Sequence, residues 1–419
     1  RAIGEPGVVP DPYTGLWIPN MIESAEVTYV VGTPAAATSD YVDISFASEI
    51  VVPEDAWVDW NASAQEFITV GEAHPDGLNA NSKVVVTFRD DLFDFVWHDG
   101  SQFSVADIVL FIVTAFDLGD PESPYYDEAQ AAGVENLKSL WRGFRILDTD
   151  PLTYEYYTMA TDLDAESTVA RADLMPEWTY GTAGWHNLAI GLRAEGNTRL
   201  AFSSGKADAN EVEWMNYIAG PALEILADEL ESAASDTFIP YEATLGEFVS
   251  ASAARARYQN LQDWYDEKGH FWIGLGPFYL EEAFPIEKSV LIRRFEDYPD
   301  PADRFAGYGE PPFANPVLSG PNRVTGGNAA TFEIEVTLPD GSAYAASDID
   351  SVKYLLFNAS GELVEVGDAT GGAGGVYAVE LSGQQTSALG TGSARMEIAV
   401  VPKPVVIASF DALDFTVSQ

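Results

Sequence analysis

The sequence predicts an α+β domain over residues 1–313, with a mixed sheet and flanking helices, followed by an all-β sandwich over residues 314–419. All ten tryptophans lie before residue 273. The last 106 residues carry 4 basic and 12 acidic side chains, whereas the first 313 carry 17 and 54. A stretch rich in proline and glycine, 308–322, lies between the two parts, as is typical of domain edges.

Alternating apolar and polar residues over 331–338, followed by further short strand-like runs separated by turn signals, indicate the all-β part. The expected strands are 331–338, 351–357, 362–366, 376–381, 394–401 and 410–417. Strands at this spacing predict an immunoglobulin-like sandwich, although the cysteine–tryptophan core of antibody domains is absent. We expect this module to be a spacer or a stabilising element rather than a dedicated binding domain.

Helix caps and apolar periodicity indicate the elements of the first part. The expected helices are 104–116, 221–231 and 244–265, and the expected strands are 83–88, 153–157, 271–274, 278–280 and 289–293. Ser104 and Asp107 have the spacing of a capping box. Thr244 and Glu247 repeat that spacing before the longest helix, which Gly269 is expected to end. Helices and strands that intermix without strict alternation favour a mixed sheet.

The composition excludes several classes of function. The chain has 21 basic and 66 acidic residues, a formal net charge of −45, so nucleic acids and anionic membranes would be repelled. The acids are spread along the chain, which indicates a solvated surface and would also suit a saline habitat. There is no cysteine, which excludes disulfides and thiolate metal sites. No apolar run approaches the roughly 20 residues of a membrane-spanning helix.

Four stretches, in the same order, resemble the oligopeptide- and nickel-type extracellular solute-binding proteins (family 5). They are DPYTGLWIPNMIES at 11–24; VTFRDD at 86–91 with WHDGSQFSVADIV at 97–109; GFRILDTDPLTY at 143–154; and GHFWIGLGPFY at 269–279 with LIRRFEDY at 291–298. The His98-Asp99-Gly100 segment with the ADIV that follows it is the most specific of them. Together the four stretches span about residues 11–300.

The resemblance implies a periplasmic-binding-protein-like lobe that belongs to the binding component of an ABC importer. In the family, a second lobe follows the last of these motifs and completes the ligand cleft. Here the chain runs from 298–301 almost directly into the linker, and the stretch 27–82 looks like an insertion. We therefore expect one lobe, with its partner lobe upstream of Arg1 or with the family's order rearranged.

Tryptophans are the candidates for ligand contact, because aromatic side chains often line solute clefts. The candidates are Trp97, Trp178, Trp185 and Trp272. For two of them, Trp97 and Trp272, packing in the core is the favoured alternative. The neighbouring His98, Asp99 and Gly274 are interpreted as scaffold, since glycine allows close approach of two backbones.

Motifs for catalysis and for metal binding are missing from the sequence. There is no nucleophile elbow, phosphate loop or dinucleotide fingerprint, and His74, His98, His186 and His270 lack the spacing of metal ligands. Glu177 beside Trp178 and Glu213 beside Trp214 are the first places to look for glycosidase chemistry, but we interpret them as surface acids. Acid pairs at 148/150, 162/164 and 348/350 do not match a calcium loop. Two Asn-x-Ser glycosylation sequons, at 61 and 358, are interpreted as polar residues of turns.

We therefore expect a monomeric, extracellular or periplasmic binding protein, without catalytic residues, cofactor or metal. It would deliver a peptide or another small solute to ABC permease subunits. The alternative is a cell-surface glycan-active enzyme or adhesin with an immunoglobulin-like appendage. Ligand-induced stabilisation without product formation would favour the first, and oligosaccharide turnover that disappears in Glu177→Gln would favour the second.

Overall fold

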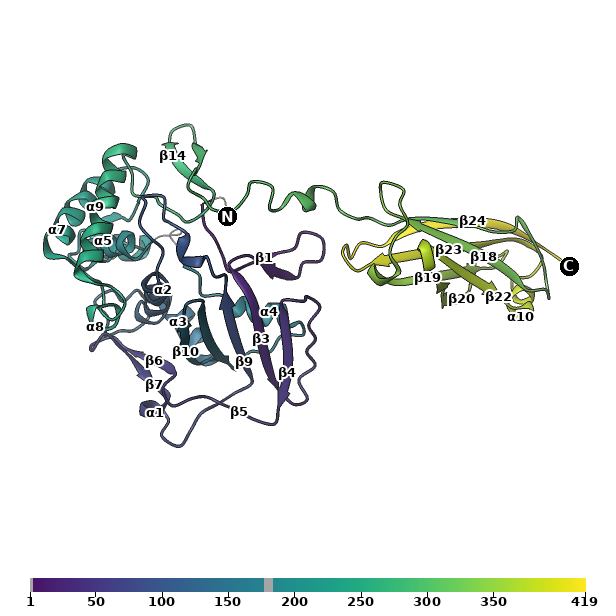
Figure 1. The fold of residues 1–419 in the computed structure, drawn as a ribbon, viewed down its shortest axis with the longest axis horizontal. Coiled ribbons are helices and arrows are strands. Elements are labelled where there is room, and N and C mark those ends of the chain that lie inside the picture. The colour runs from purple at the N-terminus through teal and green to yellow at the C-terminus, as the bar shows by residue number, and fades with distance from the viewer. Residues whose placement is uncertain (1–2, 177–183) are drawn as a thin grey trace. The chain divides into compact units, whose positions relative to one another are not determined.

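The chain folds into two compact units (Figure 1). The computed structural model describes residues 3–176 and 184–419. Unit 1 comprises Arg1–Pro10 and Leu16–Asp300, and unit 2 comprises Asp11–Gly15 and Pro301–Gln419. The units therefore divide somewhat before the boundary expected at 313/314. The whole structure is mixed α/β, with more strand than helix.

A seven-stranded mixed sheet forms the centre of unit 1. In spatial order its strands are β4 (Val42–Ala47), β3 (Ile22–Val30), β9 (Ser82–Phe88), β11 (Leu152–Thr158), β10 (Trp141–Thr149), β6 (Trp57–Asn61) and β7 (Glu66–Thr69). β3 and β4 are parallel, and the other neighbours are antiparallel. The stretch 27–82, which the sequence suggested to be an insertion, supplies β4, β6 and β7 and is integral to this sheet.

Alternation along β9 shows how the sheet acquires a buried face. Val84, Val86 and Phe88 are fully buried, whereas the residues between them are half-buried, as the two-residue period of a strand requires. These side chains belong to one core cluster with those of helices α2 (Val105–Asp117) and α4 (Ala165–Arg171). Burial of this face against helices therefore contributes to the apolar stabilisation of unit 1.

Three further helices of unit 1 pack side by side: α5 (Trp185–Gly196), α7 (Ala222–Asp236) and α9 (Ala251–Lys268). α9 begins after Ser250, whose hydroxyl accepts the N–H of Ala253 at 3.2 Å. The expected start at Thr244 is therefore wrong, since Thr244 lies in the separate short helix α8 (Glu242–Leu245). Gly269 ends α9 as expected, with a φ of 72° that glycine adopts at little steric cost.

Smaller elements complete unit 1. They are the helices α1 (Val70–Ala73), α3 (Glu128–Leu140) and α6 (Ser204–Asn210) and the paired strands β1 (Val8–Pro10) with β2 (Trp17–Pro19), β5 (Ile50–Val51) with β8 (Asn79–Ala80), β12 (Leu200–Ala201) with β13 (Glu213–Trp214), and β14 (Phe278–Phe284) with β15 (Ser289–Arg294). The expected strands at 278–280 and 289–293 correspond to β14 and β15. The expected strand at 271–274 is wrong, because that stretch is irregular.

Unit 2 consists of two sheets that share one apolar core. One sheet contains β16 (Asn315–Ser319), β18 (Ala330–Thr337), β22 (Val376–Leu381) and β21 (Thr370–Gly371), and the other contains β17 (Arg323–Thr325), β24 (Ser409–Ser418), β23 (Gly392–Pro402), β19 (Ile349–Phe357) and β20 (Leu363–Asp368). A short helix, α10 (Gly383–Ala388), follows β22. All six strands expected from the sequence are present. Alternate residues are buried along several of them, such as Phe332, Ile334 and Val336 on β18.

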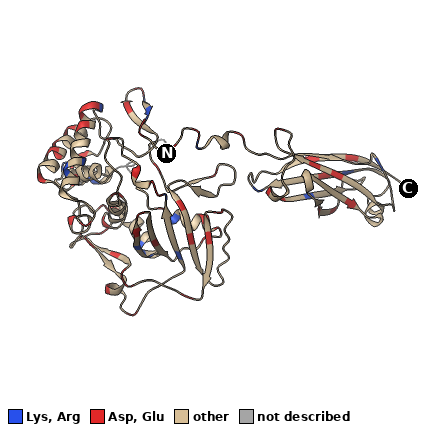
Figure 2. Cartoon of the chain, in the orientation of Figure 1, with Lys and Arg blue, Asp and Glu red and all other residues tan. Residues whose placement is uncertain are grey.

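Acidic side chains are distributed over both units (Figure 2). This agrees with their even spread along the sequence and indicates a solvated acidic surface. In the described part of the chain, no helix combines the length and the apolar character needed to cross a bilayer.

Close packing around one helical glycine yields a first prediction. In α5, a Cβ added to Gly191 would lie 2.0 Å from the hydroxyl oxygen of Tyr217 and 2.8 Å from Cζ of Phe202. Both side chains are buried, so overpacking should cost about 1–3 kcal/mol. We expect Gly191→Ala to destabilise unit 1, although Gly→Ala in an open helix position stabilises by roughly 0.5–1 kcal/mol.

The matched control is Gly133→Ala in α3, where nothing lies within 4 Å of the added Cβ. This variant should stabilise unit 1. Urea unfolding followed by tryptophan fluorescence measures both effects, because all ten tryptophans precede residue 273 and so report on unit 1 alone. If both variants changed the free energy of unfolding equally, the contact with Tyr217 would not be the cause of the change in Gly191→Ala.

Candidate functional site

A buried ion pair ties α9 to the start of α2. Nη1 and Nη2 of Arg257 donate to the two carboxylate oxygens of Asp107, at 2.7 and 2.8 Å. The backbone N–H and the hydroxyl of Ser104 also donate to Asp107, at 2.9 and 3.1 Å, so the expected capping interaction is present. Burial opposes ionisation of Asp107, but Arg257 and the other donors hold its pKa below the usual value.

The same carboxylate fixes the start of α5. The backbone N–H of Trp185 donates to Oδ1 of Asp107 at 2.8 Å. Asp107 thereby accepts hydrogen bonds from three segments that are far apart in sequence. Because a buried carboxylate is stable only when its oxygens are paired, the positions of these three segments depend on one another.

His186, in the first turn of α5, extends this network to Asp99. Its Nε2 lies 2.8 Å from Oδ2 of Asp99, and both side chains are fully buried. Its Nδ1 lies 3.3 Å from Nη1 of Arg257, which can only donate. Nδ1 must therefore accept, which places the proton on Nε2, where it is donated to Asp99. We call Asp99, Asp107, His186 and Arg257 the buried network.

Asp99 is held ionised by its donors. Burial raises the pKa of this carboxyl, but His186 and the N–H and hydroxyl of Ser101 outweigh that effect, and the pKa lies below its usual value. The N–H and the hydroxyl of Ser101 donate to Asp99 at 3.0 and 3.1 Å.

His98 connects the same loop to the irregular stretch at 271–276. Its Nδ1 accepts the N–H of Gly274 at 3.0 Å, and its Nε2 donates to the carbonyl of Gly276 at 2.9 Å. The N–H of Gly276 in turn donates to the carbonyl of Ile3 at 2.9 Å. These bonds replace the strand ladder that was expected for 271–274. A Cβ on Gly274 would lie 2.0 Å from the Ile3 oxygen, so the expected close approach of two backbones is confirmed.

A second junction lies at Arg89. Its backbone N–H donates to the carbonyl of Met21 at 3.1 Å, and its guanidinium makes two hydrogen bonds to Asp300, at 2.9 and 2.8 Å. Phe88 packs against Tyr154, with ring centroids 5.6 Å apart. Leu16–Ser24, 86–109, 143–154 and 269–298 are therefore linked by direct contacts inside unit 1.

The four candidate tryptophans differ in their surroundings. Trp97 and Trp185 are 0% and 1% exposed, and a Cβ on Gly184 would lie 3.1 Å from Cε2 of Trp97, so the structure brings these two close together. Trp272 is half-buried, and Trp178 lies outside the described residues. The burial of Trp97 and Trp185 favours packing, and contact with a ligand stays a prediction for all four.

Some of the other candidate residues have local partners in the described part of the chain. Glu177 lies outside the described residues, and Trp214 is exposed with its Nε1 donating to the carbonyl of Phe202 at 2.8 Å. Asp162 pairs with Arg171 at 2.7 Å. Within the part of the chain that the structure describes, no group of three or more acidic or histidine side chains is placed to hold a metal ion.

Sequence reasoning missed His186 and Arg257. A signal for Arg257 was present, since it lies between Ala254, Tyr258 and Leu261, which are the apolar positions of α9. A charged residue on the apolar face of a helix indicates a buried partner. Nothing in the sequence identified Asp107 as that partner, because the two are 150 residues apart.

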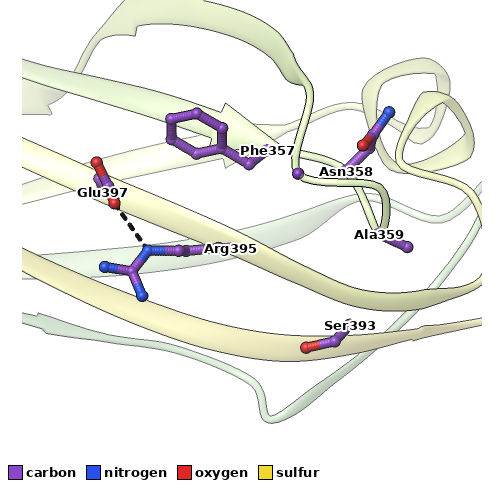
Figure 3. A pocket seen from close by; sticks show the side chains of 7 residues that line it. Phe357, Asn358, Ala359, Ser393, Arg395 and Glu397 are labelled. Carbon is purple, nitrogen blue, oxygen red and sulfur yellow. Dashed lines mark hydrogen bonds and ion pairs between the residues drawn. The ribbon is translucent and has the colours of Figure 1, made fainter.

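Unit 2 has a small open hollow on the outer face of its five-stranded sheet (Figure 3). Its volume is about 290 Å³. The lining residues are Phe357, Asn358, Ala359, Gly361, Ser393, Arg395 and Glu397. The strands β19 and β23 and the turn after β19 provide them.

Comparisons with known proteins leave the chain without an assigned family. No family model matches it, and no curated protein matches it. Among solved structures, the Lin-41 filamin domain has 19% identity and a TM-score of 0.20, over 26% of this chain and 96% of that one. A DUF4785 family protein from Legionella pneumophila has 13% identity and a TM-score of 0.20, over 25% of this chain and 28% of that one. Values this low assign neither fold nor function.

We expect Arg257→Met to destabilise unit 1 strongly. Methionine retains much of the volume but leaves Asp107 as a buried charge without its cation, which typically costs about 3–5 kcal/mol. Lys138→Met is the control, because Lys138 pairs with Asp59 at 2.8 Å at a partly exposed position and ion pairs near the surface contribute roughly 0–1 kcal/mol. Denaturant unfolding followed by tryptophan fluorescence measures both. A loss below about 1 kcal/mol in Arg257→Met would contradict the role of the buried network.

The stability of unit 1 should fall between about pH 6.5 and pH 4 because of His98. Burial lowers the pKa of His98 to about 4, and protonation of Nδ1 would point a proton at the N–H of Gly274. A histidine with a depressed pKa in the folded state binds its proton first in the unfolded state, so its stabilisation is complete above the unfolded pKa and is lost as the pH falls.

The expected loss from His98 is about 3 kcal/mol across this window. It should be absent in His98→Gln, which is already destabilised at neutral pH. His74→Gln, at an exposed position, should leave the profile unchanged. Urea unfolding at a series of pH values measures it, and an identical slope for wild type and His98→Gln would exclude His98 as the titrating group.

Proposed function

We propose that this chain is the extracellular, non-catalytic solute-binding component of an ABC-type importer, or a large fragment of one. One observation carries the proposal. The stretches that resemble the solute-binding family are scattered over almost 300 residues of sequence, yet the parts of them that lie in unit 1 contact one another. The N–H of Arg89 donates to Met21, and Phe88 packs against Tyr154. His98 is hydrogen-bonded to Gly274 and Gly276. A shared tertiary role explains why the stretches occur together and in order.

Unit 1 is then a periplasmic-binding-protein-like lobe, and unit 2 is an immunoglobulin-like sandwich attached to it. The buried network makes the lobe a rigid support, since shifting any one of its segments would unpair a buried charge. Such a lobe suits a binding protein whose halves move as rigid bodies when a ligand binds. The partners are a small solute, such as a peptide, and the permease subunits that receive it.

Binding would draw on aromatic side chains and a few oriented polar groups, with no bond made or broken. Among the four candidate tryptophans, Trp272 is the described one that is only partly buried. Trp97 and Trp185 support the lobe from within, where they flank His186 of the buried network. Trp272 is therefore the first residue to test.

The test is ligand-induced thermal stabilisation, measured with a panel of short peptides and oligosaccharides. A ligand present at 100 times its Kd should stabilise the folded state by about 2.7 kcal/mol. Mass spectrometry of the same mixtures should show the ligand unchanged. Trp272→Ala should reduce the stabilisation, whereas Trp214→Ala, which removes an exposed tryptophan outside the candidate set, should not.

Two outcomes would contradict the proposal. The first is turnover of an oligosaccharide or peptide by the purified chain, which would favour the enzyme alternative. The second is the absence of any stabilising solute, both in the panel and among compounds released from the protein on denaturation.

A further inference from the structure

The hollow of unit 2 lies where the outward side chains of β19 and β23 meet. Phe357 is paired with Arg395 in the register of these strands. Their neighbours Leu356, Ala394 and Met396 point into the apolar core and are buried, so the alternation of the strands directs Phe357, Ser393, Arg395 and Glu397 outward. The turn at 358–361 closes one side of the hollow.

The polar groups of the hollow retain hydrogen-bonding capacity. Nε of Arg395 donates to Glu397 at 2.8 Å, and its Nη1 lies 3.8 Å from Asp414, which leaves guanidinium N–H groups for a ligand. Asn358 uses one of its two amide N–H groups on Glu362, at 2.9 Å. Among the described residues, no hydrogen bond is recorded for the hydroxyl of Ser393. The hollow therefore offers both hydrogen-bond donors and hydrogen-bond acceptors to a ligand.

The charges of the hollow favour a neutral ligand. The one cation, Arg395, is already paired with Glu397 and lies near Asp414. An added anion would meet two carboxylates, and an added cation would meet the guanidinium. Hydroxyl groups, each of which both donates and accepts, match this mixture of groups better than a charged ligand does.

Shape and apolar lining define the ligand further. The half-buried ring of Phe357 forms one wall, and a flat apolar face can pack on such a ring. A volume of about 290 Å³ lies at the lower end of the roughly 300–1,000 Å³ typical of ligand sites. We propose that the hollow binds one neutral sugar ring, packed on Phe357 and hydrogen-bonded to Asn358, Ser393 and the Arg395–Glu397 pair.

This sugar ring has two possible sources. One is a saccharide from the surroundings. The other is a glycan of this chain itself, because Asn358-Ala359-Ser360 is a glycosylation sequon and Asn358 lines the hollow. In that case a transferase would join C1 of the sugar to Nδ2 of Asn358. The C1–O bond to a lipid-linked phosphate donor would break, and the amide proton would leave to a base.

The first arm of the test uses the full chain produced in the bacterial cytoplasm, where it carries no glycan. Saturation-transfer NMR with methyl hexosides and N-acetylhexosamines measures binding. We expect a weak signal, with a Kd on the order of 1 mM, that falls at least about tenfold in Phe357→Ala. Phe410→Ala is the matched control, since Phe410 is an exposed aromatic residue on β24 of the same sheet but does not line the hollow.

The second arm distinguishes the two sources. The chain is secreted from a eukaryotic host, and its intact mass is compared with that of Ser360→Ala and Asn61→Gln. Ser360→Ala removes the sequon at Asn358 but keeps every residue that lines the hollow. A glycan lost only in Ser360→Ala, with free-sugar binding restored in that variant, would identify the chain's own glycan as the occupant. An unmodified Asn358 with binding retained would identify an external saccharide.

The proposal is overturned if none of the sugars binds to the unglycosylated chain. It is also overturned if they bind equally well to wild type and to Phe357→Ala. Circular dichroism and the melting temperature of each variant establish that it is folded, so a lost signal is not mistaken for an unfolded protein. Neither result bears on solute binding by unit 1.

Discussion

The carboxylate of Asp107 is the interaction on which the rest of unit 1 depends. It is fully buried, and it accepts hydrogen bonds from the loop before α2, from the first residue of α5 and from Arg257 of α9. An ion in an apolar interior is tolerated only when nearly all its hydrogen-bonding sites are filled. Each of the three segments is therefore required to satisfy a charge that the other two also need, and none can move independently.

His186 and His98 extend this constraint through tautomers fixed by their neighbours. Each ring donates from Nε2 and accepts at Nδ1: His186 between Asp99 and Arg257, and His98 between Gly276 and Gly274. A second proton on either ring would sit on Nδ1, where it would face an N–H group of Arg257 or of Gly274. Asp99 and His98 are adjacent in sequence, so one turn is anchored on both sides.

Unit 2 is organised by a different principle. Its two sheets bury alternate side chains in a shared apolar core, and the described residues of that core include no charged side chain. Such a core leaves the outward positions free to vary, since they contribute little to packing. Phe357, Ser393, Arg395 and Glu397 occupy outward positions of this kind, and their combination of an aromatic ring with paired charges forms the hollow.

Local sequence signals predicted those helices and strands that are determined by interactions between residues close together in the sequence. Ser104 and Asp107 marked the start of α2, and Gly269 marked the end of α9. Alternation over 331–338 and short apolar runs between turn signals identified the expected strands of unit 2. The helix start predicted at Thr244 was wrong because Ser250 provides the cap of α9. The strand predicted at 271–274 was wrong because this stretch makes its hydrogen bonds with His98 rather than with a strand. The pairings of Arg257 with Asp107 and of His186 with Asp99 were decided only by the tertiary structure. They join residues 150 and 87 positions apart, and no local pattern specifies which buried charge will meet which.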